Sequence, residues 1–249
     1  MTLRTKAQGF TIVELLIVIV VIGILAAITI VAYNGVTEKA RVSAGKSFAG
    51  QVKHRDLADA VGTWTFDECS GTTLANTGGN AATPSNNVTG TTTFSTETPN
   101  GTGCSLSLNG SSYITTVIGL SNTYYSKSLW FKTASGSSAM NLISDAGTGN
   151  QSAFYINTLR ISSGHNNVWS SVAGTTALND DKWHFAYLEY KANTPSTTGT
   201  MTVSIDGVTI DSKNNVNAMT SPTNPVAIGT FNGGSNFSGL IDDVMIVVK

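Results

Sequence analysis

The chain has 249 residues, a formal net charge of −1 and only 12% charged residues, and it is rich in Gly, Ser, Thr and Asn. With 14 Lys and Arg against 15 Asp and Glu, and only two cysteines, it shows no basic stripe and no Cys/His cluster, so we expect neither a nucleic-acid partner nor a zinc site. The composition favours an exported β-rich protein, and no cofactor is expected to be required.

A polar leader at residues 1–9 precedes an apolar segment at residues 10–33. The leader carries Arg4 and Lys6, so this end of the segment should remain cytoplasmic. About 24 residues at roughly 1.5 Å each give a helix of about 36 Å, enough to span a hydrocarbon core of about 30 Å. A cleaved secretory signal, whose apolar region is only about 7–15 residues long, and a plain uncleaved anchor are the alternatives.

Glu14 is the one charged residue of the apolar segment. An ionised side chain inside a bilayer costs about 2.5–3.5 kcal/mol even on mild scales, so Glu14 is a functional clue. With Gly9 and Phe10, in "GFTIVELLIVIVVIGILAAI", it resembles the N-terminus of type IV prepilins and pseudopilins. The resemblance implies a membrane peptidase that cleaves after Gly9 and methylates the new amine of Phe10.

The same resemblance implies that the helix anchors the precursor in the cytoplasmic membrane and later packs among other subunits in the core of a surface filament. Cleavage creates a positive amine on Phe10, one helical turn before Glu14. The resemblance favours the amine of an adjacent subunit as the partner of Glu14, which would set the register of each subunit along the filament.

Residues 34–61 are predicted to continue the helix as an amphipathic linker, so the N-terminal helix as a whole covers residues 10–61. Its apolar stripe recurs about every four positions and consists of Val36, Ala40, Ala44, Phe48 and Val52. Gly35, Gly45 and Gly50 each weaken the helix by up to about 1 kcal/mol relative to Ala, so we expect bends.

Residues 62–249 are predicted to form an all-β head, which makes the fold class α+β. Short runs rich in β-branched and aromatic residues alternate with Gly, Asn, Ser and Thr clusters, as in "SLSLN", "SAFYIN" and "LIDDVMIVV". In "SIDGVTI", Asp206-Gly207 suits a two-residue hairpin turn. More than ten such runs favour a two-sheet sandwich.

Several segments of the head, in order, resemble the laminin-G-like, concanavalin A-like jelly-roll family. They include "GTWTFDECSGTTLANTGGN", "SLSLNGSSYITT", "DDKWHFAYLEY", "GTMTVSIDGVTI" and "SGLIDDVMI". Domains of this family bind carbohydrates or proteins in some relatives and act as spacers in others, so the fold does not decide the function.

A membrane-anchored glycan-active enzyme is the rival interpretation, because glycoside hydrolases of this architecture use paired carboxylates. No glutamate here has an aspartate two residues later, so no catalytic residue is expected. His165 and His184 do not change this expectation, because His184 matches a structural position of the family that the head resembles. Trp64, Trp130 and Trp183 are interpreted as core residues. Sugar-stacking candidates near polar loops are Tyr124, Tyr125, Trp169 and Phe237.

Two further features of the head are predicted. Cys69 and Cys104 are the only cysteines of an exported domain, which favours a disulfide over two buried thiols. A structural calcium ion could join Asp67 and Glu68 to Asp242 and Asp243, since the first and last strands of related jelly rolls often lie side by side. Solvated acids at strand ends are the alternative.

These observations predict a structural subunit of a type IV pilus-like filament, with a displayed β-sandwich head. The alternative is a minor pilin or pseudopilin whose head is an adhesin for a surface glycan or protein. The expected partners are other subunits, the prepilin peptidase and the membrane.

Overall fold

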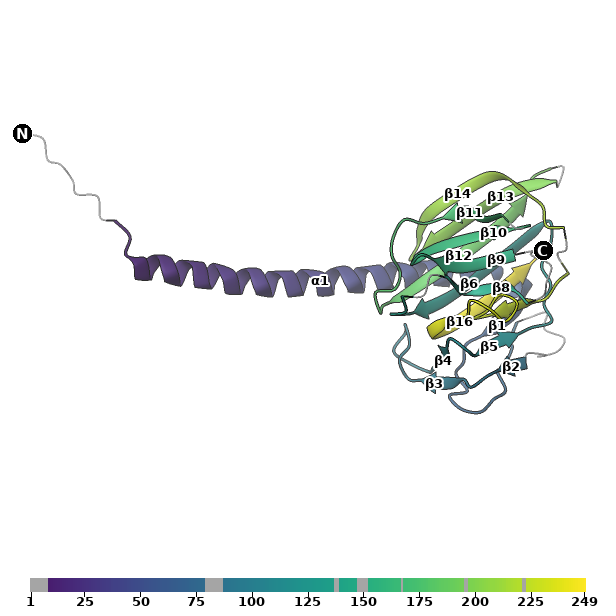
Figure 1. Cartoon of the computed structure of the whole chain (residues 1–249), viewed down its shortest axis with the longest axis horizontal. Coiled ribbons are helices and arrows are strands. Elements are labelled where there is room, and N and C mark those ends of the chain that lie inside the picture. Colours follow the sequence, from purple (N-terminus) through teal and green to yellow (C-terminus); the bar gives the residue numbers. More distant parts are fainter. Residues whose placement is uncertain are drawn as a thin grey trace, which may run out of the picture. The chain divides into compact units, whose positions relative to one another are not determined.

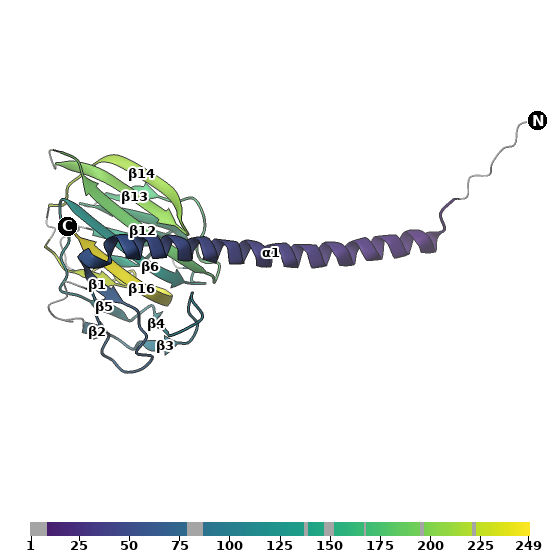
Figure 2. The same cartoon turned by 180° about the vertical axis from the view of Figure 1, so that it is seen from behind.

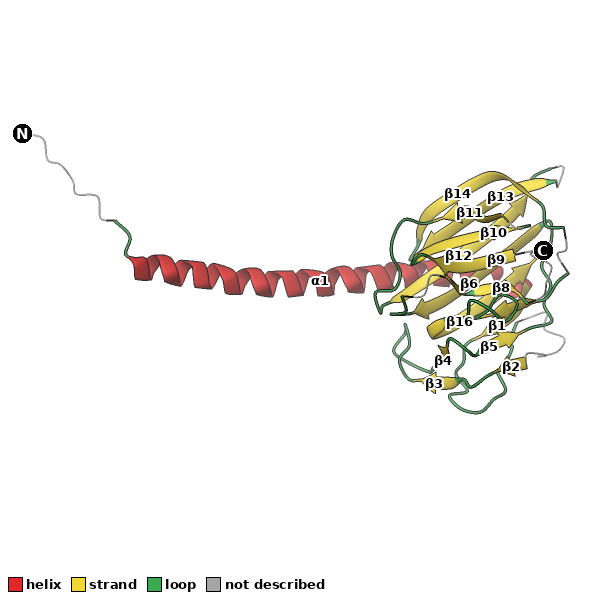
Figure 3. Ribbon diagram, viewed as in Figure 1, coloured by secondary structure: helices red, strands yellow, loops and turns green. Residues whose placement is uncertain are grey.

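The computed structural model of the chain describes residues 9–78, 87–136, 139–146, 152–166, 168–194, 197–220 and 223–249, so of the predicted leader only Gly9 is described. Within these ranges one helix and one 3-10 turn precede sixteen strands (Figures 1 and 3). The helical elements are α1 (Ile12–Asp56) and η1 (Leu57–Asp59). The strands are β1 (Ala60–Trp64), β2 (Asn87–Thr89), β3 (Thr93–Ser95), β4 (Ser105–Asn109), β5 (Tyr113–Thr115), β6 (Tyr124–Lys132), β7 (Ala139–Asn141), β8 (Ile143–Asp145), β9 (Ser152–Asn157), β10 (Arg160–His165), β11 (Val168–Ala173), β12 (Trp183–Ala192), β13 (Thr198–Ile205), β14 (Val208–Asn217), β15 (Val226–Ile228) and β16 (Ser238–Val248). Helix α1 ends before the predicted limit at 61, and the first strand begins before the predicted limit at 62.

Residues 1–43 and 44–249 form two separate compact units. In the first unit the apolar side chains of α1 are exposed, for example Ile12 at 85% and Val31 at 73%. In the described part of the chain, α1 is the one helix long and apolar enough to cross a membrane. Gly23 and Gly35 lie inside α1 without ending it, because the helix continues from Ile12 to Asp56.

The last turns of α1, residues 44–56, belong to the second unit and pack on one sheet of the head (Figure 2). Phe48 meets the rings of Phe185 and Tyr187 at centroid distances of 6.0 and 5.6 Å. The predicted stripe was partly wrong, because Val36, Ala40 and Ala44 are exposed, and Gly45 is buried in place of Ala44. A Cβ on Gly45 would lie 2.7 Å from Trp130, so glycine permits this close approach of helix and sheet.

The larger sheet has eight strands in the order β14-β13-β12-β6-β16-β4-β3, with β1 also paired to β16. Strands β4 and β1 follow one another along the same edge of β16: β4 pairs with residues 238–241 and β1 with residues 244–247. The register of β16 shifts between Asp242 and Met245, and Asp243 has a φ of 45°. This β-bulge lies where β16 changes partner.

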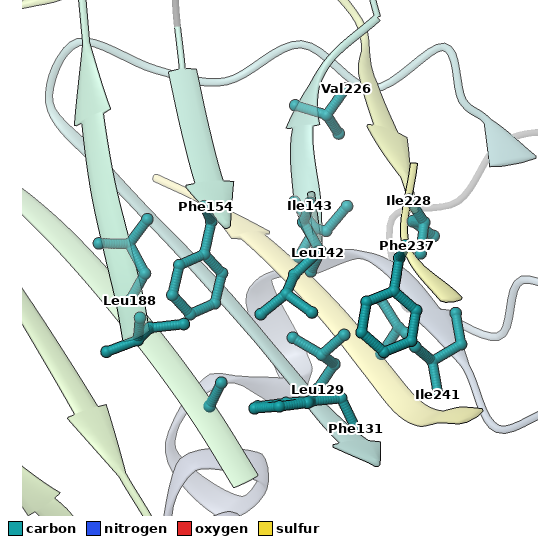
Figure 4. Packing of buried hydrophobic residues seen from close by; sticks show 14 of the residues in the cluster. Leu129, Phe131, Leu142, Ile143, Phe154, Leu188, Val226, Ile228, Phe237 and Ile241 are labelled. Carbon is teal, nitrogen blue, oxygen red and sulfur yellow. The ribbon is translucent and has the colours of Figure 1, made fainter. Parts of the chain in front are cut away.

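Two four-stranded sheets, β11-β10-β9-β7 and β2-β5-β15-β8, make the opposite layer. Leu142 joins the two sheets. Its N–H donates to Phe154 O at 2.9 Å, and its carbonyl oxygen accepts the N–H of Gly229 at 2.8 Å. The core lies between the layers and includes Leu129, Phe131, Phe154 and Leu188 (Figure 4). The predicted sandwich is therefore confirmed.

The predicted hairpin at Asp206-Gly207 is confirmed. Strand β13 ends at Ile205 and β14 begins at Val208, so the loop has two residues. Asp206 and Gly207 have φ values of 52° and 84°, as the tight turn requires. The turn lies against α1, since a Cβ on Gly207 would meet Phe48 at 3.3 Å.

Candidate functional site

Glu14 is bonded to the start of its own helix. Thr11 immediately precedes α1, and both its N–H and its hydroxyl donate to Glu14 Oε2 at 2.8 Å. In return the N–H of Glu14 donates to Thr11 Oγ1 at 3.2 Å. This reciprocal arrangement is a capping box, which satisfies free N–H groups at the helix start and places a carboxylate at the positive end of the helix dipole.

Sequence reasoning missed this role of Thr11, although the spacing Thr-x-x-Glu could have revealed it. The predicted partner of Glu14, the amine of Phe10 on an adjacent subunit, belongs to the cleaved protein and stays a prediction. In the single uncleaved chain, Phe10 is 84% exposed and Glu14 is exposed beside it. Both residues are therefore exposed in the described structure.

In the head, the predicted disulfide between Cys69 and Cys104 is present, with Cα atoms 5.4 Å apart. Cys69 lies just after β1 and Cys104 just before β4, the two strands that share one edge of β16. The bridge thus joins the segment that leaves β1 to the segment that enters β4. It also fixes Asp67, whose Oδ1 accepts the N–H of Cys104 at 3.3 Å.

Beside the disulfide, Asp67, Asp242 and Asp243 line a surface cavity of about 310 Å³. The two residues from β16 lie at its bulge, which aims adjacent side chains to the same place. Burial, the Asp243 carboxylate and, more weakly, that of Asp67 raise the pKa of Asp242 to about 8. Burial also raises the pKa of Asp243, against the attraction of Lys53.

The donors at this cavity are those that calcium prefers, namely carboxylate and amide oxygens, with Asn100 added to the aspartates. A cation would also relieve the mutual repulsion of the acids. Glu68 does not line the cavity and instead accepts the N–H of Ala75 at 2.6 Å, so it leaves the predicted ligand set. Among the described residues no three His, Cys, Asp or Glu side chains are arranged to hold a metal ion, so calcium stays a prediction.

The aromatic residues divide between core and surface. Tyr125 and Phe237 are completely buried and are core residues, not sugar contacts. Trp64, Trp130 and Trp183 are buried as predicted, and the side chain of Trp169 lies outside the described residues. Tyr124 remains a surface candidate.

Tyr124 lines an open cavity of about 850 Å³ near the end of α1. Glu189 Oε2 accepts the hydroxyls of Tyr124 at 3.0 Å and Tyr187 at 2.7 Å, and Arg55 Nη2 lies 3.5 Å away. Lys249 Nζ lies 5.1 Å from the Tyr124 ring centroid and so covers one ring face. The cavity therefore offers fixed hydrogen-bonding groups beside a partly covered aromatic ring.

Both histidines of the head serve structure. His184 Nδ1 and Nε2 lie 2.8 Å from Asp206 and 3.0 Å from Asp180, so the ring ties the hairpin turn to the loop before β12. His165 is 1% exposed, and burial followed by the charge of Lys127 lowers its pKa to about 4. The contacts of His184 agree with its predicted structural interpretation.

Lys127 carries a buried amine that sequence reasoning missed. It lies on the core side of β6 with no exposed surface, and its Nζ donates to Ile143 O at 3.0 Å and Ser152 Oγ at 2.7 Å. Burial lowers the pKa of Lys127 to about 7, although Asp145 opposes this shift. A neutral amine has two N–H groups, and the two acceptors match them.

Comparison with known proteins gives separate matches for the two parts of the chain. Residues 4–30 match a family model described as a prokaryotic N-terminal methylation motif, and residues 76–249 match one described as the concanavalin A-like lectin/glucanases superfamily. Type IV major fimbrial protein FimA of Dichelobacter nodosus (strain VCS1703A) is 42% identical over 72 residues, which are 28% of this chain and 44% of FimA. The chain thus spans less than half the length of this relative.

Solved structures resemble the head at the level of the fold. The botulinum neurotoxin type G receptor binding domain has a TM-score of 0.56 and 18% identity, covering 76% of this chain and 47% of that chain. Domain 4 of AbnA, a GH43 extracellular arabinanase from Geobacillus stearothermophilus in complex with arabinotriose, has a TM-score of 0.56 and 20% identity, covering 76% of this chain and 92% of that chain. At these identities the similarity establishes a shared sandwich and nothing finer.

Proposed function

Because the chain belongs to the concanavalin A-like lectin/glucanases superfamily through residues 76–249 and carries a prokaryotic N-terminal methylation motif at residues 4–30, we propose that it is a structural subunit of a type IV pilus-like surface filament. The observation that carries this proposal is the exposed apolar helix that begins at a capping box containing Glu14. An exposed apolar surface of this extent needs lipid or other subunits to cover it. In the filament core, other subunits cover this apolar surface.

In this proposal a peptidase removes residues 1–9, methylates Phe10 and leaves the helix in the cytoplasmic membrane. The subunit then enters the filament, where Glu14 exchanges hydrogen bonds within its capping box for the charged amine of a neighbouring Phe10. An unpaired charge in a low-dielectric core costs several kcal/mol, so only the register that pairs the two groups is stable. The head has a displayed, non-catalytic role.

The test is Glu14→Gln, which keeps the side-chain shape and removes the charge. We expect the variant to be inserted, cleaved at Gly9-Phe10 and oxidised at its disulfide, but to enter sheared surface filaments poorly. Mass spectrometry of the N-terminal peptide reports cleavage and methylation, and quantitative proteomics of the sheared fraction reports assembly. Wild-type filament yield from pure Glu14→Gln subunits, or an intact Met1 leader on the surface protein, contradicts the proposal.

A second candidate function is adhesion by a minor pilin or pseudopilin, and the cavity at Tyr124 favours it. Arg55 and Glu189 contact one another and Lys249 is held by Asp56, and such fixed groups suit recognition of a hydroxyl-rich ligand. A solved relative of the same fold is in complex with arabinotriose. Abundance separates the two functions, because a scaffold subunit dominates the sheared filaments and an adhesin is rare in them.

Glycan binding supplies the direct test of this second function. Binding of neutral trisaccharides by the full chain should be lost in Glu189→Gln and kept in Glu97→Gln, a control whose carboxylate pairs with Lys132 away from the cavity. Equal binding by both variants, or no binding by the wild-type chain, contradicts a sugar site at Tyr124.

A further inference from the structure

The cavity at Tyr124 places an aromatic ring between two cationic side chains. Tyr124 of β6 pairs directly with Lys191 of β12, and its carbonyl oxygen on the other side accepts the N–H of Lys249 at 3.1 Å. Side chains opposite one another on neighbouring strands lie on the same face, about 4.5–5.5 Å apart at Cβ. All three residues line the cavity, and the end of α1 contributes Arg55 from the same compact unit.

Arg55 is held on one side and has free donors on the other. Its Nη2 lies 2.5 Å from the completely buried carboxylate of Asp56, and it also donates to the Tyr187 hydroxyl. Its guanidinium carbon lies 5.4 Å from the centroid of the Tyr187 ring. Nε and Nη1 form no hydrogen bond within the described part of the chain, and the side chain is 49% exposed. A guanidinium fixed in this way can receive a carboxylate.

Lys191 is the second cation available to a ligand. Its side chain is exposed and forms no ion pair or hydrogen bond within the described ranges. Lys249, in contrast, lies 3.3 Å from Asp56 and 2.9 Å from Asp59, so its charge is already matched. The unmatched positive charge among the side chains that line the cavity therefore lies at Lys191.

Glu189 restricts the kind of anion that fits. Its Oε2 accepts the hydroxyls of Tyr124 and Tyr187, while its Oε1 forms no hydrogen bond within the described chain. A free carboxylate oxygen accepts a hydrogen bond from a hydroxyl but repels a bare anion. A ligand that satisfies both Glu189 and the cations needs an acid group and a separate hydroxyl, beside a body that can contact the Tyr124 ring.

On the basis of the second candidate function, adhesion, on which this step rests, we propose that the cavity at Tyr124 binds a sugar that carries a carboxylate. The carboxylate lies between Arg55 and Lys191, and a ring hydroxyl donates to Glu189 Oε1. Because Arg55 belongs to α1 and the other groups belong to the sheet, the bound sugar contacts both elements.

The test is calorimetric titration of the full chain in detergent micelles, with empty micelles as the blank. The probes are methyl β-D-glucuronide and methyl β-D-glucoside, which differ only in a carboxylate or a hydroxymethyl group at C6. We expect the glucuronide to bind at least about tenfold more tightly. Added salt should reduce this preference, because it screens charges on an open surface. Acetate, which has the charge without the hydroxyls, should bind more weakly than the glucuronide.

The outcomes separate this proposal from the function on which it rests. Equal affinity for the two glycosides overturns the carboxylate preference and leaves sugar binding at the cavity standing. Equal affinity for acetate and the glucuronide also overturns it, because the cavity then recognises charge alone. If neither these glycosides nor neutral trisaccharides bind at millimolar concentration, both the proposal and the sugar-binding function fail.

Lys191→Gln locates the acid group. The residue has no partner in the described structure, so the variant should keep its fold, and it should lower the glucuronide-to-glucoside affinity ratio by about tenfold. Lys191→Glu should lower the ratio further. Lys213→Gln is the matched control, since this exposed lysine of β14 does not line the cavity. An unchanged ratio in Lys191→Gln, or the same loss in Lys213→Gln, contradicts the assigned role.

Discussion

The buried amine of Lys127 gives a pH dependence whose size follows from its surroundings. Its pKa falls from 10.5 to about 7 on folding, because burial penalises the charged form. Between these values the unfolded chain binds the proton and the folded chain does not, so stability rises with pH. The slope is about 1.4 kcal/mol per pH unit, and the total across the window is about 5 kcal/mol.

Lys127→Met keeps the approximate length of the side chain and removes this titration. It also leaves Ile143 O and the Ser152 hydroxyl without their donor, which costs about 1–3 kcal/mol. Near pH 10.5 the variant should therefore be less stable than wild type by that amount. Near pH 7 it should be more stable by about 2–4 kcal/mol, so the sign of the difference changes within the window.

The titratable groups that face Lys127 do not change the pH dependence of the stability difference between Lys127→Met and wild type. His165, from β10, has a pKa of about 4 and stays neutral throughout the window. Asp145 from β8 and Tyr125 from β6 are present in both proteins, and burial raises the pKa of Tyr125 well above its ordinary value, outside the window. Asp242 titrates near pH 8, but it does so equally in wild type and variant and cancels in the comparison.

The assay is urea unfolding of the full chain in detergent micelles, followed by tryptophan fluorescence at steps from pH 6.5 to about 10.5. Lys132→Met is the control, because neighbouring carboxylates raise the pKa of Lys132 and place its titration above the window. Its stability should run parallel to that of wild type. If the curves of Lys127→Met and wild type also run parallel, Lys127 is charged in the folded protein and the reasoning is refuted.

Three further predictions concern the head. Replacing Cys69 and Cys104 by Ser should lower the free energy of unfolding by roughly 4 kcal/mol for a loop of about 36 residues, and a urea midpoint unaffected by reductant would contradict this. Calcium should raise the melting temperature, more strongly as Asp242 loses its proton near pH 8, and Asp242→Asn or chelation should remove the effect. Gly45→Val should destabilise the docked helix by about 1–3 kcal/mol, because its Cβ would lie 2.7 Å from Trp130, whereas Gly35→Val meets no neighbour.

The sequence predicts best where one local pattern decides the structure. The apolar run identifies the helix, "SLSLN" and "SAFYIN" coincide with β4 and β9, and Asp206-Gly207 identifies its turn. Strand β10, "RISSGH", was missed because Ser and Gly give no β signal, and Ser163 enters the core only because its hydroxyl bonds to Ala153 O.

The candidate sites were less predictable because they depend on contacts between distant segments. Asn100 lines the acidic cavity from the loop that leads to Cys104. The Cys69–Cys104 disulfide holds this loop near β16. Glu68 was assigned to the same cavity by proximity in sequence, but the turn after Asp67 directs its carboxylate to Ala75. Gly45 replaces Ala44 on the docked face because Trp130 occupies the space of a side chain, which periodicity alone does not show.

The pairing of β1 with β16 has a mechanical consequence. The docked end of α1 leads through η1 into β1, whose ladder to β16 joins Ala60 to Val247 and Trp64 to Val244. Because ladder hydrogen bonds lie perpendicular to the strands, a pull along β1 loads them in shear, together rather than one after another. Beyond the end of β1, the Cys69–Cys104 bridge carries the same load covalently to the segment that enters β4. Tension along the helix therefore reaches β16, an interior strand of the larger sheet, through an edge strand, β1, whose ladder is loaded in shear.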